Sequence, residues 1–391
     1  MLKPSSSIQQ YTKISFCVAL WIYIFIASYS LYHVTTILPV CLLPCLVFVM
    51  RKNFALQSFK QTLAIFFSWG LIFLFSLMQG VFPAPVNYIL LLCGCVYIIC
   101  SYDERKSIAD FFLRGYTIIL AISFIEYLLY LNGFSLQLAV LNRPGPTVYQ
   151  YIQLPFNLIQ KPTSNVGLTR FQSLANEPGL VGTLNALLLF NINRKEYKKE
   201  YYILIITSLF TLSLAFYVLF VFYIVSSLRS IRNIGFAIII IMGIYGIYLL
   251  NQDRPEVKYV QYRIELGEDA DNRTSDQFET IFKQFRASNF KWLGKGMDSL
   301  LQMNITDGGN DGIKKLTYEV GYVGILLLFI SYSYVICKNR RSNAERIIFL
   351  IAFWASFYQR AGLLSPFYAL LIAMPYLDKK PLKSLKGNYL Y

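Results

Sequence analysis

Long apolar segments with few charges recur along this chain from Ile14 to Leu377, and they constrain its fold more than any other feature. Ile14 to Tyr32, for example, covers 19 residues without an Asp, Glu, Lys or Arg. A stretch of about 18 or more such residues is typical of a helix that spans a membrane. The composition agrees, because 56% of the 391 residues are hydrophobic and 15% are charged, whereas soluble domains average roughly 45–50% and about 25%. The sequence therefore predicts an all-α fold, a polytopic helical bundle in a lipid bilayer that forms one domain over residues 1–391.

The placement of charge predicts the orientation of the chain. The net charge is +15, and seven short polar segments carry 22 basic and 7 acidic residues, whereas the rest of the chain carries 14 of each. An excess of Lys and Arg in short loops marks the cytoplasmic side of a membrane protein. We therefore expect a multi-pass protein with both termini in the cytoplasm, and the charge does not require nucleic acid as a partner. The seven segments are 1–13, 51–61, 101–114, 194–200, 229–233, 338–346 and 378–391.

About twelve crossings fit this orientation. The stretch Tyr201–Leu228 is long for one crossing and has basic residues at both ends, so we interpret it as two short helices that turn near Thr211–Ala215. Two longer polar segments, 133–177 and 251–315, then lie on the outer side. The expected crossings are Ile14–Tyr32, Val34–Met50, Thr62–Phe82, Val86–Cys100, Gly115–Asn132, Pro178–Asn193, two within Tyr201–Leu228, Gly235–Leu250, Leu316–Ile336, Ile347–Tyr358 and Leu363–Leu377.

The larger outer segment contains one clear helical pattern. Phe278, Ile281, Phe282 and Phe285 follow the spacing i, i+3, i+4, i+7 that places side chains on one face of a helix. The sequence therefore predicts an amphipathic helix that lies on the membrane surface or on the bundle.

The first candidate site is the segment Arg170–Gly182, RFQSLANEPGLVG. Pro178 is favoured as the first residue of a helix, which makes Glu177 the expected N-cap. A helix N-terminus with an arginine nearby favours an anion such as phosphate. The alternative is that Arg170 and Glu177 form an ion pair with each other.

The second candidate site is the large outer segment with its exit. Arg263, Arg273 and Arg286 are candidates for binding a phosphate or diphosphate, or they are simply solvated charges. Glu319 and Arg360 lie at the predicted edge of the hydrocarbon layer, where a charge usually needs a partner, and the two could pair. The glycines at positions 294, 296, 321 and 324 allow close backbone approach, either to a ligand or to a neighbouring helix.

No metal site is predicted. The chain has one histidine, His33, and its seven cysteines all lie within or at the ends of apolar segments, where they are expected to act as small hydrophobic side chains. We therefore expect neither a metal ion nor another cofactor.

Four short motifs in a fixed order, together with an arginine early in the large outer segment, resemble the O-antigen polymerase and ligase superfamily. They are Arg-Phe-x-Ser-x-x-x-Glu-Pro-x-x-x-Gly from Arg170, Thr-x-Ser from Thr211, Gly-x-Gly from Gly294 and Gly-x-x-Gly from Gly321. The ligase branch carries a histidine ahead of the last motif, and here Asn310 stands in that position with Asp311 beside it. This departure favours the polymerase branch.

The resemblance implies a metal-independent glycosyltransferase of the inner membrane that takes part in lipopolysaccharide, capsule or exopolysaccharide synthesis. It would transfer a growing glycan from undecaprenyl diphosphate onto another lipid-linked repeat unit at the outer face, alongside a flippase and a chain-length regulator. In that scheme Arg170, Arg273 and Arg360 hold the diphosphate, with Arg263, Arg286 and Asn310 as further substrate contacts. Glu177 orients Arg170 or serves as the base, and Asp311 and Glu319 are the competing bases. The alternatives are a flippase or transporter of lipid-linked oligosaccharide, an O-antigen ligase, and a metal-dependent lipid-linked glycosyltransferase.

Overall fold

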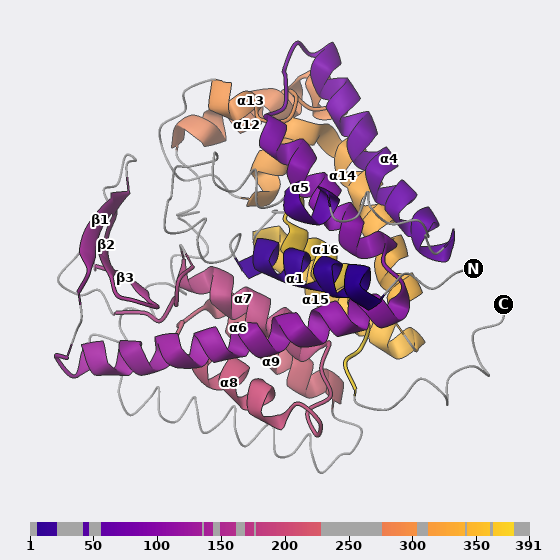
Figure 1. The fold of residues 1–391 in the computed structure, drawn as a ribbon. Helices are drawn as coiled ribbons and strands as arrows, with labels where there is room; N and C mark the ends of the chain where they lie inside the picture. Colours follow the sequence, from indigo (N-terminus) through magenta and orange to yellow (C-terminus); the bar gives the residue numbers. More distant parts are fainter. Residues whose placement is uncertain are drawn as a thin grey trace.

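The chain folds into a mostly helical structure (Figure 1). The computed structural model describes residues 6–21, 42–46, 56–134, 137–143, 149–161, 169–175, 177–227, 276–302, 312–340, 342–359 and 363–378. Three described helices are long and apolar enough to cross a membrane: residues Ser58–Met78 of α4 (Leu56–Met78), α6 (Tyr102–Leu131) and α14 (Gly312–Asn339). The other helices are α1 (Ser6–Trp21), α5 (Pro85–Ile99), α7 (Pro178–Leu189), α8 (Lys198–Leu209), α9 (Leu214–Ser227), α12 (Asp276–Ala287), η2 (Asn289–Lys291), α13 (Ser299–Gln302), α15 (Asn343–Gln359) and α16 (Pro366–Ala373).

Helix α6 begins well before the predicted crossing at Gly115. It starts at Tyr102 because Ser101 and Glu104 form a capping box, in which the Glu104 carboxylate accepts the Ser101 amide at 2.9 Å and the Ser101 hydroxyl accepts the Glu104 amide at 3.4 Å. This pairing satisfies backbone N–H groups that have no partner inside the helix. The segment predicted as a cytoplasmic loop is therefore the first part of a helix of 30 residues.

The stretch after the lysine-rich segment forms two helices, as the sequence predicts. Helix α8 ends at Leu209 and α9 begins at Leu214. The backbone of Leu212, between them, has a φ of 47°, which no helix accommodates. The predicted break near Thr211 is thus confirmed.

The segment 133–177, predicted as an outer loop, contains a small sheet that the sequence did not predict. Strands β1 (Ala139–Arg143), β2 (Tyr149–Gln153) and β3 (Leu158–Gln160) pair antiparallel in the order β1-β2-β3. In Figure 1 the sheet lies beyond the C-terminal end of α6. Its inner side chains, Ile152, Leu154 and Ile159, form a cluster with Tyr130 of α6.

Glu126 helps to anchor this sheet to α6. Its carboxylate accepts the amide N–H of Phe156 at 2.8 Å, in the turn between β2 and β3. The carboxylate of Glu126 therefore lies where the sheet packs against the C-terminal part of α6.

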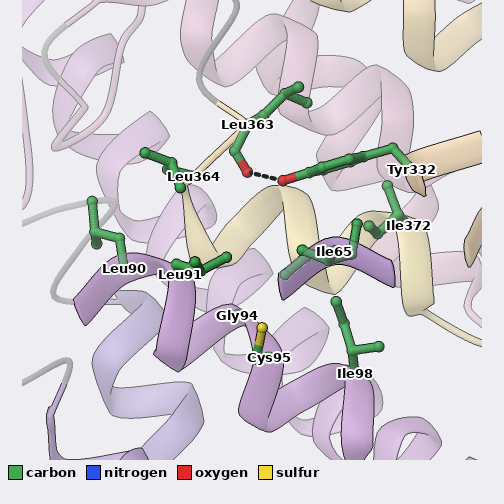
Figure 2. Close-up of a pocket in the computed structure, with 11 residues that line it drawn as sticks. Ile65, Leu90, Leu91, Gly94, Cys95, Ile98, Tyr332, Leu363, Leu364 and Ile372 are labelled. Carbon is green, nitrogen blue, oxygen red and sulfur yellow. Dashed lines mark hydrogen bonds between the residues drawn. The ribbon is translucent and has the colours of Figure 1, made fainter. Parts of the chain in front are cut away.

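Helix α16 is short, and every one of its residues is buried. It packs along α5 so closely that a Cβ on Gly94 would lie 3.0 Å from Ala369 Cβ. A small cavity of about 10 Å³ remains between these helices and the Tyr332 ring, whose hydroxyl donates to the Leu363 carbonyl at 2.8 Å (Figure 2). A space of that size holds one water at most, and its lining is apolar, so it is a packing defect and not a ligand site.

Two buried arginines hold the C-terminal turn of α16. Arg105 of α6 donates to the Ala373 carbonyl at 3.1 Å, and Arg340, just after α14, donates to the Leu371 carbonyl at 3.2 Å. Each arginine also donates to a side-chain amide oxygen, Arg105 to Asn339 Oδ1 at 2.6 Å and Arg340 to Asn191 Oδ1. Cations are favourable at a helix C-terminus, where carbonyl groups lack helical partners. Both arginines belong to segments predicted as cytoplasmic loops, and the structure buries them instead.

Candidate functional site

The first motif packs against the turn between α8 and α9, in a region called here the Arg170 site. Arg170 donates from Nε to the Thr211 carbonyl at 2.8 Å and from Nη2 to the Leu212 carbonyl at 3.0 Å. The Phe171 amide donates to the Phe210 carbonyl at 2.9 Å. The guanidinium therefore stabilises a turn that the strained Leu212 backbone would otherwise disfavour.

Gly182 allows the motif Thr211–Ser213 to pack against the motif that begins at Arg170. A Cβ at this position would lie 2.8 Å from Ser213 Cβ and 2.9 Å from Thr211 Oγ1, closer than real side chains approach. The two motifs around Arg170 and Thr211 are thus spatial neighbours, and the glycine is required by helix packing.

Glu177 occupies the predicted N-cap position of α7, with Pro178 as the first helical residue. Its backbone is extended, with φ −149° and ψ 137°, but its side chain makes no capping hydrogen bond to the helix. The residue therefore begins the helix as predicted, and it is part-buried.

A buried polar cluster adjoins the Arg170 site, and the sequence analysis did not find it. Ser123 Oγ lies 2.8 Å from Ser173 Oγ, and Asn157 donates to the Ser123 carbonyl at 3.1 Å. Gln172 is fully buried, and within the described residues neither its Nε2 nor its Oε1 has a hydrogen-bond partner. Buried amides are normally paired, so Gln172 marks a place that a water molecule or a polar ligand would satisfy. Its position inside the first motif was the only signal in the sequence.

The second pair of motifs forms what we call the Glu319 site, made by the loop Gly294–Ser299 and the N-terminal part of α14. The loop passes between three helices. Its Met297 amide donates to Ser76 Oγ of α4 at 2.8 Å, and Asp298 Oδ2 accepts from the Ala84 amide at 2.8 Å and from Asn87 Nδ2 at 2.6 Å. Asp298 thereby satisfies polar groups at the start of α5, which has Pro85 at its first position.

The backbone of the Gly294–Ser299 loop lies directly against the backbone of α14 near Gly321. Gly321 interrupts the helix with φ 70° and ψ 176°, and the Gly296 amide donates to the Glu319 carbonyl at 2.9 Å. A Cβ on Gly294 would lie 2.2 Å from the Glu319 carbonyl oxygen, and one on Gly321 would lie 2.4 Å from the Gly294 nitrogen. The glycines of the two motifs therefore contact each other. Of the two roles that the sequence left open, Gly294 and Gly321 serve close approach of the loop to a helix and not to a ligand.

Glu319 is the buried charge of this site, with 2% of its surface exposed. Its carboxylate accepts the backbone amide of Asp298, and Lys315 and Asp298 are the charged groups that act on it electrostatically. Within the described part of the chain its Oε1 has no hydrogen-bond partner, and neither has the buried hydroxyl of Ser299, the residue after Asp298. A carboxylate oxygen and a hydroxyl thus remain open in one small region.

The helix predicted from the phenylalanine spacing is confirmed as α12, and it lies on the bundle. Phe278, Phe282 and Phe285 are buried with Leu300 and Tyr318, next to Glu319 in sequence. Arg286, a predicted substrate contact, is exposed in the last turn of this helix. The Lys314–Glu279 ion pair, with a separation of 2.6 Å, further joins α14 to α12.

The remaining predicted site residues lie outside the described residues. They are Arg263, Arg273, Asn310, Asp311 and Arg360. The hydrogen bonds given above for Arg170 join it to the α8–α9 turn, and those for Glu319 join it to the Gly294–Ser299 loop. The motifs therefore assemble as two separate pairs.

Among the described residues, no group of three or more His, Cys, Asp or Glu side chains is placed to hold a metal ion.

Comparisons with known proteins identify no relative: no protein-family model, curated protein or solved structure matches this chain.

Proposed function

We propose that the protein is a polysaccharide polymerase of the cytoplasmic membrane. It transfers a growing glycan from a polyprenyl diphosphate carrier onto a lipid-linked repeat unit at the outer face, without a metal ion. The proposal starts from the four motifs and their order. What supports it further is that the motifs form two tightly packed pairs, and that one pair leaves a buried carboxylate oxygen open.

Glycosyl transfer of this kind involves three events at the site. A hydroxyl of the acceptor attacks the anomeric carbon of the donor, the bond from that carbon to the diphosphate oxygen breaks, and the hydroxyl proton moves to a base. Glu319 suits the role of base because its Oε1 has no hydrogen-bond partner among the described residues, while the Asp298 amide holds the carboxylate in place. Asp311 and Glu177 stay as competing bases.

The departing diphosphate needs positive charge. Arg170, Arg273 and Arg360 are our candidates, since a guanidinium binds phosphate oxygens in a bidentate manner. Arg170 donates from Nε and Nη2 to backbone carbonyls, which fixes its guanidinium beside the α8–α9 turn.

Surface glycan from a deletion strain tests the proposed function. A lost polymerase leaves products with a single repeat unit on a gel, whereas loss of all surface glycan indicates a flippase or a ligase. An unchanged long-chain ladder would refute all three functions.

Replacing Arg170 with alanine is expected to abolish long-chain polysaccharide while the protein still inserts into the membrane. The substitution removes a cation for the diphosphate, and it also removes the two hydrogen bonds that hold the α8–α9 turn. Gel profiles of the glycan and the amount of protein in the membrane fraction are the measurements. Arg114→Ala is the comparison, because the Arg114 side chain is 52% exposed and pairs with Asp110 of the same helix. Normal chain lengths in Arg170→Ala would remove Arg170 from the site.

A further inference from the structure

A groove runs along the side of α4 and α5, and we call it the α4–α5 groove. Its volume is about 400 Å³, within the range of about 300–1,000 Å³ that small-molecule sites occupy. Apart from the Tyr88 hydroxyl, every side chain that lines it is apolar. The lining residues are Phe66, Gly70, Phe73, Leu74, Leu77, Tyr88, Leu91 and Leu92.

The groove is open to the side and elongated. Phe66, Leu74 and Leu92 are 48%, 51% and 42% exposed, so the lining does not close over it. On α4 the lining extends from Phe66 to Leu77, which corresponds to about 16 Å at about 1.5 Å per residue. This shape fits an extended chain better than a compact ring.

Gly70 gives the groove its depth. A Cβ at Gly70 would meet no atom within 4 Å, so no neighbouring helix fills the space left by the missing side chain. Gly94 on α5 differs, because a Cβ there would lie 3.0 Å from Ala369 Cβ. Gly94 therefore serves helix packing, whereas Gly70 leaves an open space.

One end of the groove adjoins the Glu319 site. Leu77 follows Ser76, which accepts the Met297 amide, and Tyr88 follows Asn87, which donates to Asp298. Figure 1 shows α12 and α13 near this end of α4 and α5. The loop region also supplies positive charge, from the ammonium groups of Lys291 and Lys295 beside the rings of Trp292 and Phe290.

We infer that the α4–α5 groove holds part of the hydrocarbon chain of a single-chain anionic lipid, with the headgroup near Lys291 and Lys295 at the loop end of the groove. The inference rests on the proposed function and deepens it, because it locates the carrier chain of the lipid-linked substrate. One groove between two helices takes one chain, whereas a phospholipid with two chains would leave one of them outside. Burial of apolar surface supplies the affinity, and the lysines favour a phosphate at the polar end.

Binding of undecaprenyl phosphate to the purified full-length protein tests the inference. Gly70→Leu adds a side chain to the groove at a position where a Cβ meets no atom within 4 Å, and Leu74→Trp narrows the groove at an exposed position. Both should weaken binding about tenfold, because they displace buried contacts of the chain. Phe67→Trp adds bulk to α4 at a residue that is 60% exposed and does not line the groove, so it should bind as the unmodified protein does. Native mass spectrometry gives both the affinity and the oligomeric state, and thermal unfolding in detergent confirms that each variant is folded.

Each of the following outcomes would overturn the inference. Unchanged binding in folded Gly70→Leu and Leu74→Trp excludes the groove. An equal loss for dioleoyl phosphatidylglycerol would mean that the groove takes any hydrocarbon chain, and a change in oligomeric state would mean that a second copy of the chain fills it. The proposed function fails separately, because a deletion strain with normal glycan would refute it even if the groove binds the lipid.

Discussion

Glu319→Gln should lower the rate of polymer formation by about 10²- to 10⁴-fold, the usual contribution of a general base. The substitution keeps the shape of a side chain that is 2% exposed, but a neutral amide cannot take the proton from the acceptor hydroxyl. The folded protein should not lose stability, because a neutral group costs less to bury than a carboxylate. Chain-length profiles in cells and single-turnover transfer with purified protein are the measurements, together with thermal unfolding.

Glu279→Gln is the matched control for this experiment. Glu279 is a nearby carboxylate on α12, but it is already paired with Lys314 and is part-exposed. Its loss should leave polymer formation within about twofold of normal, since exposed ion pairs contribute little. Full activity in Glu319→Gln would exclude Glu319 as the base and leave Asp311 and Glu177 to be tested.

The second large effect concerns stability, not activity. Gly321→Ala should lower the free energy of unfolding by about 2–5 kcal/mol, the sum of left-handed backbone strain and overpacking. A Cβ at Gly321 would lie 2.4 Å from both the Gly294 nitrogen and the Trp292 carbonyl oxygen, and both are backbone atoms that cannot rotate away. Gly294→Ala should behave in the same way, because its Cβ would lie 2.2 Å from the Glu319 carbonyl oxygen and its φ is 82°.

Gly70→Ala provides the comparison for both glycine variants. It lies in a regular helix, where its Cβ would meet nothing within 4 Å, so its stability should be unchanged or higher by up to about 1 kcal/mol. The measurement is the unfolding transition of each protein in the same detergent. Equal stability of Gly321→Ala and Gly70→Ala would show that the contact between the loop and α14 is not tight in solution.

The sequence predicted those parts of the fold that depend on local patterns. Apolar length located α4, α5 and α14, the phenylalanine spacing located α12, and the flanking charges located the break between α8 and α9. Where the sequence fails, long-range contacts decide the structure. The sheet in residues 139–160 depends on packing against Tyr130, and Arg105 is buried because acceptors from distant parts of the chain surround it.

The motifs of the candidate sites could be predicted from the sequence, but the contacts between those motifs could not. Spacing identified Arg170, Glu319 and the glycines, yet it could not show that the Gly294 and Gly321 backbones cross. The sequence analysis did not identify Gln172 and Ser299. Their buried polar atoms have no hydrogen-bond partner among the described residues, and this can be seen only once the neighbouring residues are placed in space.

The two arginines at the end of α16 bear on how the topology of this protein should be mapped. Nested truncations fused to a reporter enzyme remove the chain from the C-terminus, so a fusion point between Arg340 and Pro366 keeps both arginines but deletes the carbonyls that they bind. Each such fusion would leave two cations inside the bundle without those acceptors, and the truncated chain would be free to reposition α6 or the end of α14. Side assignments from truncated fusions would then describe a different arrangement. Reporters inserted into loops of the intact chain, which keep its last helix, avoid this artefact.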